Sequence, residues 1–130
     1  MQKSKFNSLI NEGFNHIPLS KEVVIDTATP LALYLKLANN PYSYFLESVQ
    51  GGEKWGRYSF IGLAAETVIK VYNYEVQVEK NGKLIHEKLV EDPLAWIEEY
   101  QNQFKVPQLD SLPDFNGGLV GYFGYEIVRY

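Results

Sequence analysis

One stretch decides the fold class of this chain: Glu75-Val76-Gln77-Val78-Glu79-Lys80-Asn81-Gly82-Lys83-Leu84-Ile85. Polar and apolar residues alternate over its first five positions, which is typical of a strand with one buried face and one face in water. The pair Asn81-Gly82 then favours a type I′ hairpin turn, because both positions of that turn need a positive φ. Leu84 and Ile85 begin a returning strand. The stretch therefore predicts an antiparallel hairpin.

Further strand and helix signals lie on both sides of this hairpin. Apolar and β-branched runs predict strands at Val23–Ile25, Tyr44–Leu46, Tyr58–Ile61 and Thr67–Tyr72. The spacing of apolar residues predicts helices over Phe6–Phe14, from Pro30 after the N-cap Thr29, and from Pro93 to Phe104. Consecutive strands without helices between them favour an α+β fold, a mixed, largely antiparallel sheet covered by helices, over a doubly wound parallel sheet.

Length and composition limit the class of protein. The 130 residues fit one domain, and a content of 45% hydrophobic and 15% aromatic residues excludes a disordered chain. The net charge of -4 argues against a non-specific nucleic-acid binder, which needs a basic face. The sequence has no cysteine, no recognisable signal peptide and no apolar run long enough to cross a membrane. We therefore expect a cytoplasmic location and neither a nucleic-acid nor a membrane partner.

The end of the chain, from Gly117 to Tyr130, is apolar and rich in glycine. We expect a strand here, and its apolar composition means that it needs a partner on both faces. Natural termini, in contrast, are usually polar and frayed. This predicts that the chain stops inside a larger protein, and that the isolated piece self-associates through an exposed apolar surface. The alternative is a natural C-terminal core strand.

The sequence assigns no catalytic residue and no metal ligand. Two histidines, His16 and His86, are too few for a metal site of their own. The segment Gly51-Gly52-Glu53-Lys54 lacks the glycine spacing of a phosphate-binding loop. Glu98-Glu99 are neighbours on a predicted helix and do not face each other, so a solvated surface is favoured over an acid–base pair.

Two predicted strands bring together groups that suit a small ligand. Tyr44–Ser48 ends the first strand and Gly56–Gly62 begins the second, so a carboxylate, a hydroxyl, a guanidinium and aromatic rings come within reach of one another. A carboxylate binds an ammonium, arginine binds a carboxylate, and apolar walls hold the rest of a ligand. These groups favour a zwitterionic, partly apolar ligand; the alternative is a surface Arg–Glu pair beside a hairpin.

The same residues resemble a known family. Leu46–Gly62 is similar to the N-terminal region of anthranilate synthase component I, and so are Asn15–Leu19, Asp26–Pro30 and Gly117–Glu126. The resemblance implies that residues 1–130 are the regulatory domain of an enzyme that converts chorismate and ammonia to anthranilate and pyruvate in tryptophan biosynthesis. It also implies that the catalytic, Mg2+-binding half lies outside this chain, and that a glutamine amidotransferase subunit supplies the ammonia. The chain alone would then be inactive.

The resemblance further implies a feedback site for L-tryptophan in this chain. Glu47 and Ser48 would hold the polar groups of tryptophan, while Pro30 and Leu46 would line its apolar slot. Three more residues match that pocket: Arg57, Tyr58 and Ser59. Two alternatives remain open, the same region of aminodeoxychorismate synthase component I and a stand-alone amino-acid-binding module without catalysis. The run Trp55–Ser59 favours anthranilate synthase over the first of these.

Overall fold

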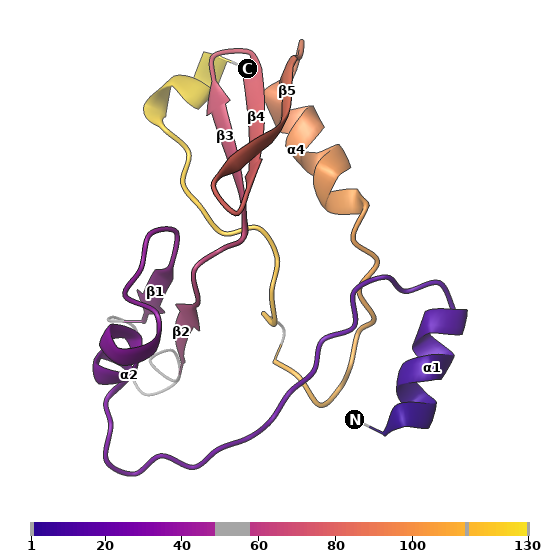
Figure 1. The fold of residues 1–130 in the computed structure, drawn as a ribbon, viewed down its shortest axis with the longest axis vertical. Helices are drawn as coiled ribbons and strands as arrows, with labels where there is room; N and C mark the ends of the chain where they lie inside the picture. The colour runs from indigo at the N-terminus through magenta and orange to yellow at the C-terminus, as the bar shows by residue number, and fades with distance from the viewer. Residues whose placement is uncertain (1, 49–57, 114, 130) are drawn as a thin grey trace. The chain divides into compact units, whose positions relative to one another are not determined.

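A computed structural model describes residues 2–48, 58–113 and 115–129. The chain forms two compact units: residues 24–89 form one, and residues 1–23 together with 90–130 form the other. Figure 1 labels the helices and strands of both units. All the described strands belong to the unit of residues 24–89, which therefore carries the sheets.

The unit of residues 24–89 contains a three-stranded antiparallel sheet in the order β3-β4-β5 (Figure 1). Its strands are β3 (Thr67–Tyr72), β4 (Glu75–Lys80) and β5 (Lys83–Leu89). Asn81 and Gly82 adopt φ angles of 51° and 72°, so the turn predicted between β4 and β5 is confirmed. Asn73, with φ 54°, makes the turn between β3 and β4.

The buried side chains of this sheet lie on β4. Val76 is fully buried and Val78 is 3% exposed, whereas the polar residues that alternate with them are only partly buried. This confirms the alternation seen in the sequence, because successive side chains of a strand point to opposite faces. β5 is exposed along its whole length, as suits a strand at the edge of a sheet.

A second antiparallel sheet in the same unit has two strands, β1 (Tyr44–Glu47) and β2 (Ser59–Gly62). The sequence predicts both strands and their adjacency, and both predictions are confirmed. Gly62 lies opposite Tyr44 in the ladder, and a Cβ at Gly62 would collide with the Tyr44 ring. A glycine is therefore needed where these two strands approach each other.

α2 (Pro30–Leu37) lies beside this two-stranded ribbon (Figure 1). It begins where the sequence predicts, because the Thr29 hydroxyl accepts a hydrogen bond from the Ala32 amide at 3.2 Å and Pro30 occupies the first turn. The ring of Tyr34 stacks on that of Phe45 in β1, with the ring centroids 5.6 Å apart. This stacking fixes the helix against the ribbon.

The other unit contains α1 (Lys3–Asn11), α4 (Pro93–Asn102) and a short 3-10 helix, η1 (Tyr125–Arg129). α1 and α4 confirm two predicted helices, and the chain leaves α1 at Gly13 with φ 92°. Asp92 caps α4, since its carboxylate accepts hydrogen bonds from the amides of Leu94 and Ala95 at 2.9 and 3.0 Å.

Asn15 joins the segment after α1 to the segment after α4. Its side-chain amide donates to the Gln103 carbonyl at 2.7 Å, and its side-chain oxygen accepts from the Lys105 amide at 2.7 Å. The backbone amides of Asn15 and His16 both donate to the Lys105 carbonyl. The His16 ring packs edge-on against Phe104, with centroids 4.7 Å apart. These contacts hold together two segments that are far apart in the sequence.

Two strand predictions are wrong. Val23–Ile25 forms no strand and is between 47% and 81% exposed, because β propensity makes a strand only where a neighbouring strand supplies hydrogen-bond partners. The glycine-rich end also forms no strand, and η1 follows residues 117–124, which have no regular structure. Gly117 and Gly118 adopt φ angles of 146° and 133°, which interrupt an extended strand.

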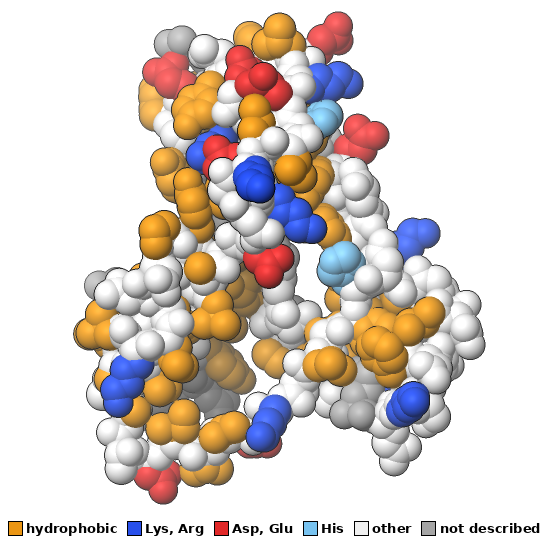
Figure 2. All heavy atoms as spheres, in the orientation of Figure 1, with side chains coloured by type: hydrophobic (Ala, Val, Ile, Leu, Met, Phe, Trp, Pro, Cys, Tyr) orange, Lys and Arg blue, Asp and Glu red, His pale blue; other side chains and the backbone are white. Residues whose placement is uncertain are grey.

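Figure 2 shows apolar side chains spread over the visible surface.

The α+β class and the antiparallel pairing are confirmed. Every strand pair in the described ranges is antiparallel, and the strands divide between two sheets. Residues 63–66, which belong to no strand, connect the two sheets.

Candidate ligand-binding site

Five of the seven predicted site residues lie where β1 and β2 pair: Leu46, Glu47, Ser48, Tyr58 and Ser59. The register places Leu46 opposite Phe60 and Glu47 opposite Ser59. Ser48 directly follows β1, and Tyr58 directly precedes β2, so both lie at the same end of the ribbon. Antiparallel pairing thus brings the two sequence segments together, as predicted.

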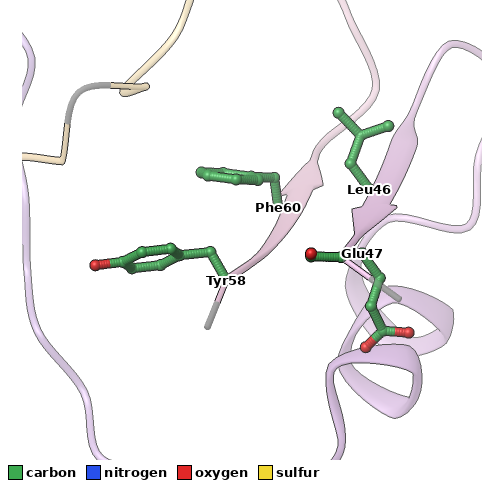
Figure 3. Close-up of a pocket in the computed structure, with 5 residues that line it drawn as sticks. Leu46, Glu47, Tyr58 and Phe60 are labelled. Carbon is green, nitrogen blue, oxygen red and sulfur yellow. The ribbon is translucent and has the colours of Figure 1, made fainter. Parts of the chain in front are cut away.

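A depression of about 380 Å³ lies at this end of the ribbon (Figure 3). Five described residues line it: Leu46, Glu47, Ser48, Tyr58 and Phe60. Leu46 is 49% exposed and Tyr58 is 61% exposed, so the depression is open to solvent. Its volume is close to the lower end of the range of small-molecule pockets, roughly 300–1,000 Å³.

One face of the ribbon at this depression is apolar and aromatic. Tyr58 and Phe60 are two residues apart, and their rings stack with centroids 6.2 Å apart and an interplanar angle of 27°. Figure 3 shows both rings extending in the same direction from β2. Leu46 shares this face because it pairs with Phe60. Ser48, two residues beyond Leu46, adds a hydroxyl to the lining.

The carboxylate of Glu47 is engaged with β2. The Ser59 hydroxyl donates a hydrogen bond to Glu47 Oε1 at 3.2 Å. Figure 3 shows this carboxylate pointing away from the rings of Tyr58 and Phe60, as strand alternation requires. Glu47 still lines the depression, and among the described lining residues it is the charged one.

Of the predicted site residues that the structure describes, Pro30 and Ser59 are not part of this lining. Pro30 lies in the first turn of α2, and it is not among the described residues that line the depression. Arg57 lies outside the described residues. Phe60, in contrast, lines the depression although the sequence does not single it out. Its spacing of two residues from Tyr58 is the signal that identifies it, because both side chains must share one face.

The described residues offer no metal centre, since nowhere in the ranges 2–48, 58–113 and 115–129 do three His, Asp or Glu side chains come together as ligands. His86 is exposed on β5. Glu98-Glu99 are exposed on α4, in agreement with the solvated surface predicted for them. None of the helices in the described part of the chain is long and apolar enough to span a membrane.

The whole chain is similar to curated bacterial proteins that share one name. Over 130 residues it is 53% identical to "Anthranilate synthase component 1" of Pseudomonas putida, and over 128 residues it is 51% identical to the protein of that name from Neisseria gonorrhoeae. The chain is homologous to the N-terminal region of anthranilate synthase component 1. The protein of that name from Acetivibrio thermocellus is more distant, at 38% identity over 123 residues.

The match to anthranilate synthase component 1 covers 100% of this chain in the Pseudomonas putida comparison, so it includes both compact units and the β1–β2 depression. The chain spans about a quarter of the length of these curated relatives: 26%, 26% and 24% in the order given above. No family model matches the chain, and no solved structure matches it.

Proposed function

We propose that this chain is the N-terminal, regulatory part of an anthranilate synthase component 1. The complete protein would act in the cytoplasm, converting chorismate and ammonia to anthranilate and pyruvate in tryptophan biosynthesis. The observation that supports this best is the 53% identity over all 130 residues. A glutamine amidotransferase subunit would supply the ammonia. By the family resemblance, the proposed Mg2+ and the catalytic residues would lie in the part of the complete protein outside this chain, and we assign these residues no catalytic step.

We propose further that the β1–β2 depression contributes the feedback site for L-tryptophan. The apolar face made by Leu46, Tyr58 and Phe60 suits an indole ring, which packs well on apolar and aromatic surfaces. Ser48 and Glu47 are also lining residues, and a carboxylate is the partner that a ligand ammonium needs. The Glu47 carboxylate, which points away from the two rings, would turn toward the depression to meet that ammonium.

The remaining residues proposed for the pocket are not among the described residues that line it. Ser59 bonds to Glu47 and so holds one of the polar groups against β2. Pro30 and Arg57 are assigned by the family resemblance. Tryptophan bound at this site would inhibit the enzyme by favouring a conformation that turns chorismate over poorly. The extent of inhibition would be set by the difference in tryptophan affinity between the two conformations.

The activity is tested on the complete protein, with chorismate and either glutamine or an ammonium salt. Formation of anthranilate and pyruvate is the expected result. Formation of aminodeoxychorismate would instead support the alternative family. Saturable tryptophan binding without any turnover of chorismate would support a binding module and overturn the enzymatic proposal.

The site is tested with Ser48→Phe in the complete protein. The large ring should fill the depression and exclude tryptophan. We expect the tryptophan concentration for half-inhibition to rise at least about tenfold, which corresponds to a loss of about 1.4 kcal/mol of binding free energy. Turnover without tryptophan should be unchanged. Ser20→Phe is the matched control, because Ser20 is exposed and lies in the other compact unit. Unchanged inhibition in Ser48→Phe would refute this site.

A further inference from the structure

Three polar residues, Tyr42, Lys70 and Glu79, form a cluster that we call the Lys70 latch. It joins β3 and β4 to the residue that leads into β1. Lys70 Nζ lies 2.6 Å from Glu79 Oε1, and it lies 5.7 Å from the centroid of the Tyr42 ring. The side chains of Lys70 and Glu79 are 26% and 21% exposed, so water screens this ion pair less than a fully solvated one.

Tyr42 lies two residues before β1 in a conformation that needs support. Its φ of 60° is left-handed, a conformation that is unfavourable for a residue with a Cβ. Its carbonyl accepts a hydrogen bond from the Ala65 amide at 3.0 Å, just beyond the end of the β1–β2 ladder. The next residue, Glu66, accepts at its carbonyl from the Asn81 amide at 2.7 Å. The entry to β1 and the exit from β2 are thus both tied to the three-stranded sheet.

We propose that Lys70 is a positioning residue for the β1–β2 depression, because it holds Tyr42 and so fixes how β1 enters the ribbon. Lys70 does not line the depression, and its effect reaches Leu46 and Ser48 only through Tyr42 and the strand that follows. Strand β1 has only four residues, so a displacement at its start is carried to the lining residues at its end. What the depression binds rests on the function proposed above; the positioning role does not.

The first measurement is amide hydrogen exchange in the complete protein. Lys70→Met keeps the length of the side chain and removes its charge, whereas Lys70→Arg keeps the charge. In Lys70→Met we expect exchange of residues 43–47 to quicken about threefold, as is typical for loss of a partly exposed ion pair. Lys70→Arg should restore wild-type exchange. Lys80→Met is the matched control, since Lys80 is an exposed lysine at the end of β4.

Two exchange results would overturn the proposal. One is unchanged exchange over residues 43–47 in Lys70→Met. The other is equal acceleration over residues 43–47 and over residues 84–88 of β5, because general loosening of the unit is not positioning. Neither result depends on tryptophan, so the positioning role and the proposed ligand fail separately.

The second measurement connects Lys70 to the ligand site. If the wild-type enzyme is inhibited by tryptophan, Lys70→Met should raise the half-inhibitory concentration about threefold at unchanged kcat, in step with the exchange result. Lys70→Arg should reverse this rise. An unchanged half-inhibitory concentration would refute the link between the latch and the depression. A wild-type enzyme without tryptophan inhibition would refute the proposed ligand, and the exchange data would still decide the role of Lys70.

Discussion

Val76→Ala is the perturbation whose size follows most directly from the structure. Val76 is fully buried on β4, so its two methyl groups lose all contact with water on folding. Removing them forfeits about 0.8 kcal/mol for each methylene-sized group, and the cavity that remains adds to this loss. The total destabilisation should be about 2 kcal/mol, because a thin sheet edged by the exposed β5 relaxes only partly around the gap.

The assay is native-state hydrogen exchange of the β4 amides in the complete protein. A loss of about 2 kcal/mol corresponds to exchange that is roughly thirtyfold faster for amides that open with this sheet. Val24→Ala is the matched control, because Val24 is 81% exposed and the same two methyl groups are removed in the same unit. Acceleration below about threefold in Val76→Ala, or an equal effect of Val24→Ala, would show that β4 does not carry the core of the unit.

Two further predictions concern a helix cap and an ion pair. Asp92→Ala removes the acceptor for two amides, so the first turn of α4 should lose about 1 kcal/mol, read as faster exchange there, while Asp92→Ser should keep most of it. Hydrogen bonds to Glu79 and then to Tyr42 raise the pKa of Lys70 above its ordinary 10.5, so the stability contributed by Lys70 is present at neutral pH and is lost as pH rises through the raised value. The difference in urea midpoint between wild type and Lys70→Met should therefore shrink above pH 10.5, and a difference that grows there would contradict this assignment.

Local sequence signals account for most of the elements. The Asn81-Gly82 turn, the Thr29 cap with Pro30, and the alternation around Val76 each depend on residues close together in the chain. The positive φ angles and the hydroxyl acceptor are set by the residues at those positions, and the alternation around Val76 shows which face of the strand can be buried. For this reason the hairpin and α2 are found at the predicted residues.

The wrong strand predictions share a different cause. Val23–Ile25 has the composition of a strand, but a strand exists only as a hydrogen-bonded partner of another strand, and composition does not name that partner. The same holds for the end of the chain, where the positive φ angles of Gly117 and Gly118 interrupt an extended run. The contacts of Asn15 with Gln103 and Lys105 are equally non-local, and no pattern in the sequence predicts them.

The candidate site is also only partly predictable from local sequence. The sequence predicts that the two strands pair, but which side chains share a face depends on the register of the pairing. The register places Leu46 opposite Phe60 and Glu47 opposite Ser59, so Leu46 and Glu47 lie on opposite faces. Side chains that follow one another along a strand point to opposite faces, so Leu46 and Glu47 do not face a ligand in the same way. The motif Leu46–Ser48 therefore contributes to the depression unequally, and Phe60 joins it from the opposite strand.

The face on which a side chain lies matters most for Glu47. It ends β1, so no further ladder position holds its side chain, and among the described residues its Oε1 accepts a 3.2 Å hydrogen bond from the Ser59 hydroxyl. Turning about its side-chain bonds would bring this carboxylate toward a ligand ammonium at the rim of the depression. We therefore expect Glu47→Gln, which keeps an acceptor for Ser59 and removes the charge, to raise the half-inhibitory tryptophan concentration about tenfold.

Ser59→Ala makes this prediction decisive, because it removes the donor and leaves the carboxylate charged. If the charge itself binds the ammonium, Ser59→Ala should change the half-inhibitory concentration less than about threefold, since an exposed hydrogen bond contributes little net free energy. The opposite order, with Ser59→Ala severe and Glu47→Gln mild, would mean that Glu47 serves the depression by holding β2 in place. The polar end of the ligand would then belong to Ser48, which lies two residues from Leu46 and lines the depression directly.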